Sequence, residues 1–241
     1  MGVPGDGRGG TRLFGLRLDI TPHPVPVDNG NASGGLLVFA RRAGPGDSLL
    51  LIETLMTLVG YRPRIVLKKV LRLDPCLDVL LGTLPTCFVP AGHGRDEVVA
   101  GIGRLAADLG DRDALVIFPE GGKFTQGRRA RAVRWLRRHG EVRRAAYASR
   151  SRHVLPPMTA GPLAAMAAAP RADIVFVAHT GLDAMDSVGA VWRGLPLRHP
   201  VRARWWRIPA AELPVGPEAR TDWLLAQWAE VDAWVRDNRE L

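Results

Sequence analysis

Cysteine and lysine are scarce in this sequence, and long apolar runs are missing. The 241 residues include only two cysteines, Cys76 and Cys87, which excludes a disulfide scaffold; they also lack the partners and spacing of a zinc site. Lysine occurs only at positions 68, 69 and 123, so arginine supplies nearly all of the positive charge. The most apolar stretch, residues 48–60, contains Glu53 and is shorter than the ~20 residues that span a bilayer. Residues 1–12 do not have the apolar stretch of a secretory signal, so any membrane contact is expected to be peripheral.

The composition is that of a folded chain with a positive charge. Hydrophobic residues make up 46% of the sequence and charged residues 24%, which supports a core and excludes disorder over most of the length. The formal net charge of +9 favours anionic partners: phosphorylated metabolites, anionic lipid head groups or nucleic acid. The basic residues are almost all arginine, and genomic codon bias explains this excess of arginine over lysine more simply than selection for binding does.

Short apolar runs alternate with amphipathic segments along the chain, which is the pattern of an α/β fold. The expected strands are residues 12–20, 36–40, 64–71, 87–90, 114–118, 174–178 and 201–208. The expected helices are residues 47–60, 96–109, 127–139, 162–169 and 217–238. We expect a flexible tail over residues 1–11 and a single domain over residues 12–241, built as a mixed, mostly parallel sheet flanked by helices.

Two segments fall where an α/β fold places its chemistry, at the carboxyl ends of expected strands. In the first, FARRAGPGDSLL, a buried strand ends in a tight turn and Asp47 opens a helix, where Asp also serves simply as an N-cap. In the second, LVIFPEGGKFT, Glu120 follows another buried strand. Gly121 lets the backbone approach a ligand closely and Lys123 suits a phosphate, although an ordinary strand-to-helix turn has the same composition.

Together and in this order, the two segments resemble the glycerolipid acyltransferase family, the lysophosphatidic acid acyltransferases. Members of that family carry H-x-x-x-x-D after one strand and F-P-E-G after a later one. Residues 64–90, 153–166 and 173–183 also look like blocks of the family, so the resemblance extends over residues 12–235. It implies a glycerolipid acyltransferase-like α/β fold.

The resemblance implies an O-acyltransferase of phospholipid synthesis. Such an enzyme moves a fatty acyl group from acyl-CoA or acyl carrier protein to the hydroxyl of a lysophospholipid such as 1-acyl-glycerol-3-phosphate. Asp47 and Arg42 would then occupy the catalytic positions, and Glu120, Gly121 and Lys123 would bind the glycerol-phosphate end. The implied chemistry needs no metal, and no cofactor besides the acyl thioester co-substrate. The implied location is cytoplasmic and peripheral at the inner face of the membrane, with the anionic membrane surface and acyl carrier protein as further expected partners.

This sequence departs from the family pattern where the motif histidine would stand, since that position is Arg42. An arginine side chain stays protonated at neutral pH and cannot act as a general base, whose loss costs ~10²–10⁴-fold in rate. Three alternatives stay open: His93 or His179 acts as the base, substrate orientation alone gives weak activity, or the chain is a silent lipid- or acyl-carrier-binding protein. In the silent case, Arg42 and Asp47 would form a structural ion pair. A second departure lies in the CFVP block, where many members carry an arginine that contacts phosphate and this sequence has Pro90 and Ala91.

A run of arginines and a late group of tryptophans are candidate binding surfaces. Eight arginines lie between residues 128 and 144, with Glu141 as the only acid. The run fits a solvated helix face, or a surface that docks on anionic membrane or acyl carrier protein. A basic nucleic-acid-binding protein is a second alternative, but no nucleic-acid-binding motif accompanies the run, so nucleic acid is not an expected partner. Trp205 and Trp206 are expected on opposite faces of one strand, one in the core and the other available to a lipid interface.

Overall fold

One mixed β-sheet organises the protein. The computed structural model describes residues 9–13, 16–21, 34–68, 86–89, 95–183 and 201–239. Their strands are β1 (Gly9–Leu13), β2 (Leu16–Thr21), β3 (Leu36–Ala40), β4 (Arg62–Lys68), β5 (Thr86–Val89), β6 (Asp113–Ile117), β7 (Asp173–Thr180) and β8 (Val201–Ile208). Within the described ranges they pair in the order β1-β2-β8-β7-β3-β6-β4-β5.

The sheet is parallel over its larger part. β7, β3, β6, β4 and β5 are consecutive parallel neighbours, whereas β8 runs antiparallel to β7 and β1 antiparallel to β2. In the register of the central strands, Leu37 lies opposite Leu115 of β6 and Ile174 of β7. Every residue of β3 and β6 is buried, because helices cover both faces of a mostly parallel sheet. The expected α/β class with a mixed, mostly parallel sheet flanked by helices is confirmed.

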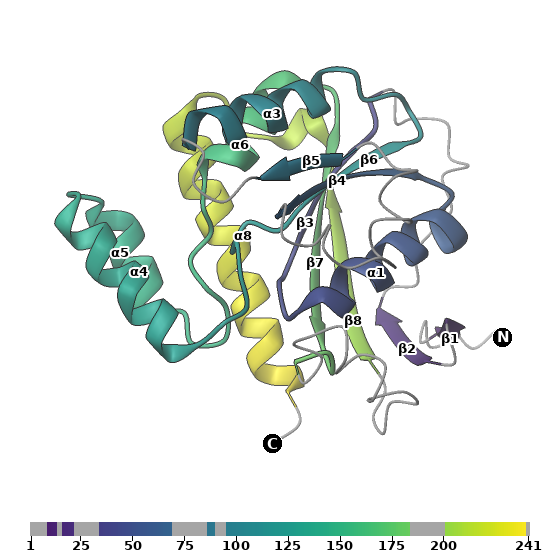
Figure 1. The fold of residues 1–241 in the computed structure, drawn as a ribbon, viewed down its shortest axis with the longest axis horizontal. Helices are drawn as coiled ribbons and strands as arrows, with labels where there is room; N and C mark the ends of the chain where they lie inside the picture. Colours follow the sequence, from purple (N-terminus) through teal and green to yellow (C-terminus); the bar gives the residue numbers. More distant parts are fainter. Residues whose placement is uncertain are drawn as a thin grey trace, which may run out of the picture.

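Figure 1 shows helices on both sides of the sheet. The helices α3 (Arg95–Ala107), α6 (Ala160–Ala168) and α8 (Pro217–Asn238) contribute to one core with Phe39, Phe176 and Trp228. The helix α1 (Pro45–Glu53) continues as the π-helix η1 (Thr54–Val59), which packs in a second core on the other face with Val38, Ile65 and Phe118. A short 3₁₀ turn, η3 (Ala210–Glu212), precedes α8.

Two further helices form a hairpin that stands apart from the sheet in Figure 1. They are α4 (Gln126–Arg138) and α5 (Val142–Arg150). Leu136, Ala145 and Ala148 form a small core of their own between them. The hairpin therefore presents a helical surface beside the main body of the fold.

Several sequence expectations match the structure residue for residue. Strands 36–40 and 201–208 and helix 217–238 have the expected bounds, and the apolar face of that helix is buried. Trp206 packs against the core that contains α8 and Trp205 against the core that contains η1, so the two indoles lie on opposite faces of the sheet as expected, but both of them, and not one, pack against a core.

Other expectations need correction. The single strand expected at 12–20 is two antiparallel strands, β1 and β2. Since β1 begins at Gly9, residues 9–11 belong to this strand and not to the expected tail; residues 1–8 lie outside the described residues. The helix α5 was not expected at all, because the buried positions that define its inner face are only alanines and give a weak hydrophobic period.

No helix in the ranges given above combines the length and apolar character of a membrane span. In the same ranges, no group of three or more His, Cys, Asp or Glu side chains is arranged to hold a metal ion.

Candidate functional site

The carboxyl ends of three neighbouring parallel strands meet at one edge of the sheet. β3 lies between β6 and β7, so the residues that follow Ala40, Ile117 and Thr180 come together there. These are the loop 41–44 with the first turn of α1, the turn 118–125 and the loop 181–183. The two segments singled out in the sequence are therefore adjacent in space.

Asp47 organises the loop that follows β3. It is the third residue of α1, and its side chain is buried, with 2% of its surface exposed. The Oδ2 atom accepts main-chain N–H groups from Ala43 at 2.6 Å and Gly44 at 2.9 Å. These N–H groups lie ahead of the helix and have no partner inside it, so the carboxylate acts as a capping group from within the first turn.

Arg42 lies against the other oxygen of the same carboxylate. Its Nη1 atom is 3.6 Å from Oδ1 of Asp47 and donates to the hydroxyl of Ser48 at 2.6 Å. The guanidinium also lies over the ring of Phe118, 4.7 Å from its centroid, in a cation–π contact. The ion pair between Arg42 and Asp47 is thus present.

Glu120 connects the same loop to a distant segment. Its Oε1 accepts the main-chain N–H of Arg42 at 2.8 Å, and its Oε2 accepts the N–H of Leu155 at 2.7 Å. The side chain is buried, and burial raises the pKa of Glu120 to about 8, against the lowering effect of those two N–H groups. Both oxygens are occupied by the protein, so this carboxyl group holds two loops together.

Gly121 and Lys123 belong to the turn after Glu120. Gly121 has a φ of 63°, in the left-handed region, and its N–H closes the turn onto the carbonyl of Phe118 at 3.0 Å. A Cβ at this position would overlap the side chain of Met158. The Nζ of Lys123 donates to the main-chain carbonyl of Asp183 at 3.0 Å. The turn is thereby tied to the loop after β7.

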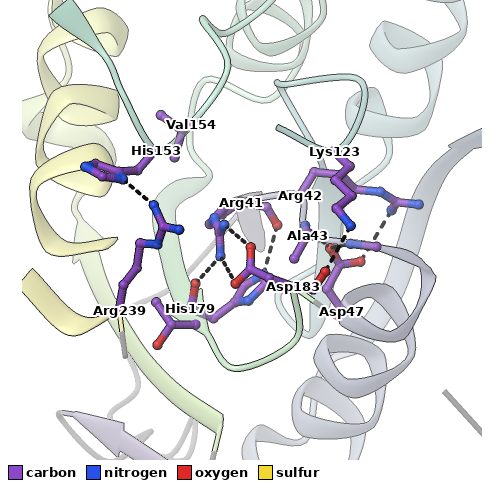
Figure 2. A network of polar contacts seen from close by, with 12 residues as sticks. Arg41, Arg42, Ala43, Asp47, Lys123, His153, Val154, His179, Asp183 and Arg239 are labelled. Carbon is purple, nitrogen blue, oxygen red and sulfur yellow. Dashed lines mark hydrogen bonds and ion pairs between the residues drawn. The ribbon is translucent and has the colours of Figure 1, made fainter. Parts of the chain in front are cut away.

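An arginine that follows β3 directly is paired with the loop after β7 (Figure 2). Arg41 is buried, and its Nη1 and Nη2 atoms donate to the two carboxylate oxygens of Asp183, at 3.3 and 2.5 Å. This guanidinium, with its hydrogen bonds, holds the pKa of Asp183 below its usual range despite the opposing effect of burial. Neither residue was a candidate from the sequence, although Asp183 ends one of the segments that resemble the family.

His179 is fixed in one tautomer. Its Nε2 lies 3.1 Å from the carbonyl oxygen of Arg41, and only a protonated nitrogen can bond to a carbonyl. Burial and the neighbouring Arg41 lower the pKa of this histidine, so the ring is neutral at pH 7 and Nδ1 carries the lone pair. Nδ1 is buried, and none of the described residues donates a hydrogen bond to it.

A pocket of about 70 Å³ lies beside this histidine, between α1 and η1 on one side and β7 and β8 on the other. A single water needs only ~10–15 Å³, so the pocket has room for more than a trapped solvent molecule. Most of its lining is apolar; two polar side chains at the sheet edge, Asp47 and His179, also line it. The other residues that line it are Leu50, Leu51, Thr54, Leu55, Val59, Val177, Leu182, Val201, Ala203 and Trp205.

The structure brings together most, but not all, of the candidates from the sequence. Arg42 contacts Asp47 through its side chain and Glu120 through its main chain, so these three form one cluster. Gly121 and Lys123 flank that cluster in the next turn, and of the site candidates only Asp47 lines the pocket. Of the two alternative bases, His179 lies at the pocket and His93 lies outside the described residues.

Comparisons with known proteins add no relative: no family model, curated protein or solved structure matches this chain.

Proposed function

We propose that this protein binds a fatty acyl chain and transfers the acyl group from a thioester to the hydroxyl of a lysophospholipid such as 1-acyl-glycerol-3-phosphate. The observation that carries the proposal is the lining of the pocket between α1, η1, β7 and β8. Its walls are mainly aliphatic, and Asp47, His179 and Thr54 are polar residues that also line it. At about 70 Å³ the pocket has room for a few methylene groups, so it suits the part of an amphiphile where the apolar chain meets the polar reacting group.

The charges around the sheet edge support the same class of ligand. Arg41, Arg42 and Lys123 all come from loops at this edge, and the Arg42 side chain is 15% exposed. Positive groups beside the carboxyl ends of parallel strands favour an anionic head group such as phosphate. The resemblance to glycerolipid acyltransferases over residues 12–235 points to this substrate class as well.

The α4–α5 hairpin supports attachment to the inner face of an anionic membrane. Nine arginines and a single acidic residue lie between positions 126 and 150. Arg131, Arg134 and Arg138 are exposed at helical spacing on α4, next to Trp135, whose surface is 42% exposed. Arginine is attracted to anionic head groups and tryptophan is favoured at the membrane interface, so this face of α4 fits a peripheral docking surface.

The test of transfer compares the wild-type protein with Arg42→His. Each purified protein is given labelled acyl-CoA and lysophosphatidic acid, and phosphatidic acid is quantified. We expect slow transfer by wild type and a gain of about 10²-fold or more in Arg42→His, because a histidine beside Asp47 restores a base to the loop. Arg42→Gln is the matched control, since it removes the charge without supplying a base, and it should show no gain.

A second candidate function is a silent acyl-chain-binding protein of the same fold. It is favoured by one specific observation, that both oxygens of Asp47 are engaged by Arg42, Ser48 and two main-chain N–H groups. The assay separates the two: a protein that binds a fluorescent fatty acid but forms no phosphatidic acid, in wild type or in Arg42→His, is a binder and not an enzyme. Absence of both binding and transfer would remove the acyl proposal altogether.

A further inference from the structure

His179 is buried beside the pocket and keeps one ring nitrogen without a partner among the described residues. It is 6% exposed at the end of β7, and it lines the apolar pocket. Its Nε2–H is held by the carbonyl of Arg41, while its Nδ1 receives no hydrogen bond from any described residue. A buried acceptor without a partner costs free energy, which a ligand that donates a proton to it would recover.

We propose that Nδ1 of His179 accepts the proton of the acceptor hydroxyl, in place of the histidine that this sequence lacks at position 42. The inference rests on the proposed acyl transfer. The alcohol O–H bond breaks and its proton passes to Nδ1. The oxygen forms a bond with the thioester carbonyl carbon, the C–S bond then breaks, and the thiolate leaving group takes the proton back from Nδ1. No oxidant, metal or further reactant is needed to balance the step.

The surroundings of His179 hold the ring for this task. Arg41 fixes Nε2 through its carbonyl, and the charged groups that act on the imidazole are Arg41, Asp47 and Asp183. The Arg41 guanidinium is itself paired with Asp183. Asp47 lines the same pocket and favours the protonated imidazolium that forms during the reaction.

The other ionisable groups of the site are less suited to the role. Arg42 is an arginine and gives up no proton at neutral pH. The oxygens of Glu120 each accept a main-chain N–H, and this residue does not line the pocket. Among the described side chains at this edge of the sheet, His179 therefore combines a place in the pocket lining with a ring nitrogen that has no partner among the described residues.

A double-variant experiment tests the inference. His179→Gln should lower the transfer rate of the wild-type background by about 10²-fold or more, the usual size of general-base loss. In the Arg42→His background the same change should cost less than about tenfold, because the new histidine supplies a second base. His153→Gln is the matched control, since the His153 ring contacts Arg239 and is not part of the pocket. Equal losses in both backgrounds would show that His179 is only structural and would overturn the inference.

The pH dependence of the wild-type rate gives a second test that needs no variant. A neutral His179 requires kcat/KM to fall only below about pH 6.5 and to stay level from pH 7 to 9. A rise through pH 8 would instead match the pKa of about 8 of Glu120 and would overturn the assignment to His179.

If wild type forms no product although Arg42→His does, the inference fails while the transfer chemistry of the fold stands. If neither forms product, the proposed function fails as well.

Discussion

Arg41 and His179 hold one another through two reciprocal hydrogen bonds. The guanidinium of Arg41 donates to the carbonyl of His179 at 2.6 Å, and Nε2 of His179 lies 3.1 Å from the carbonyl of Arg41. The two residues sit side by side because β3 and β7 are parallel neighbours that end at the same edge. This arrangement sets the tautomer of the imidazole, whose side chain lines the pocket.

Removal of the Asp183 carboxylate should weaken this arrangement. In Asp183→Ala the buried Arg41 keeps only its bond to the His179 carbonyl, and we expect a loss of about 2–3 kcal/mol in the free energy of unfolding. This loss is smaller than the loss expected for a fully buried ion pair, because the Asp183 side chain is 49% exposed. Urea denaturation measures the change. Asp222→Ala, which breaks the exposed Arg143–Asp222 pair, is the control and should cost under about 0.5 kcal/mol; equal losses in the two variants would contradict the structural role of Asp183.

Glu120 should make stability depend on pH. Its pKa rises from 4.5 in the unfolded chain to about 8 in the folded protein, so the folded state binds the proton more tightly. Between these values the free energy of unfolding falls as pH rises, with a slope of up to about 1.4 kcal/mol per pH unit. Urea denaturation between pH 6.5 and 8 measures this slope, in a range above the titration of His179.

The matched variant for this prediction is Glu120→Gln, which does not titrate. The variant should be less stable than wild type at pH 6.5, because its amide NH₂ faces a main-chain N–H that the carboxyl oxygen accepted. Its stability should nevertheless change less than that of wild type from pH 6.5 to 8. The same slope in both proteins would show that Glu120 is ionised throughout this range.

Two substitutions of Asp47 should separate the contribution of this carboxylate to stability from its contribution to catalysis. Asp47→Ala removes the acceptor of the Ala43 and Gly44 N–H groups and should cost about 1 kcal/mol, whereas Asp47→Asn keeps an acceptor oxygen and should cost less. In the Arg42→His background, Asp47→Asn should still abolish most of the gain in transfer rate, since it no longer supplies the negative charge that stabilises an imidazolium. Thermal denaturation and the phosphatidic acid assay measure the two effects. A full gain in Asp47→Asn would show that this carboxylate does not assist a base at position 42.

The basic face of α4 should carry membrane attachment. Replacement of Arg131, Arg134 and Arg138 by glutamine should weaken binding to phosphatidylserine-containing vesicles roughly a hundredfold, at ~1 kcal/mol for each arginine near the surface. Vesicle co-sedimentation at low and physiological salt measures the effect. The charge-matched control replaces Arg104, Arg112 and Arg171, which are exposed elsewhere, and should bind as wild type does.

Two results would contradict the prediction that the basic face of α4 attaches the protein to membranes. The first is an equal loss in the α4 variant and its control, which would reflect net charge alone. The second is steeply salt-dependent binding to nucleic acid by a protein that ignores the vesicles, as expected of a nucleic-acid-binding protein.

The sequence was sufficient for the parts of the fold that depend on local pattern. Strand 36–40 and helix 217–238 have strong apolar signals, and each has the bounds expected from them. The positions of Asp47 and Glu120 just after buried strands also predicted that their loops would meet. The order of the strands could not be predicted from the sequence, because strand pairing depends on the register of distant segments.

The pocket and its histidine depend on that strand order. β8 joins the sheet antiparallel to β7, and this places Ala203 and Trp205 opposite α1 and η1 as one wall of the pocket. His179 was one of two histidine candidates, and only the pairing of β3 with β7 puts its ring against the carbonyl of Arg41. The pair between Arg41 and Asp183 was missed for the same reason, since its partners lie 142 residues apart.

A bulky side chain in the pocket tests directly whether the acyl chain binds there. Ala203→Phe places a large side chain in the pocket, whereas Ala107→Phe makes the same change at an exposed position on α3. Titration with a fluorescent fatty acid measures the dissociation constant of each protein. We predict that wild type and Ala107→Phe bind alike and that Ala203→Phe binds at least about tenfold more weakly, the equivalent of ~1.4 kcal/mol. Equal affinity in all three proteins would place the acyl chain elsewhere and contradict the central claim.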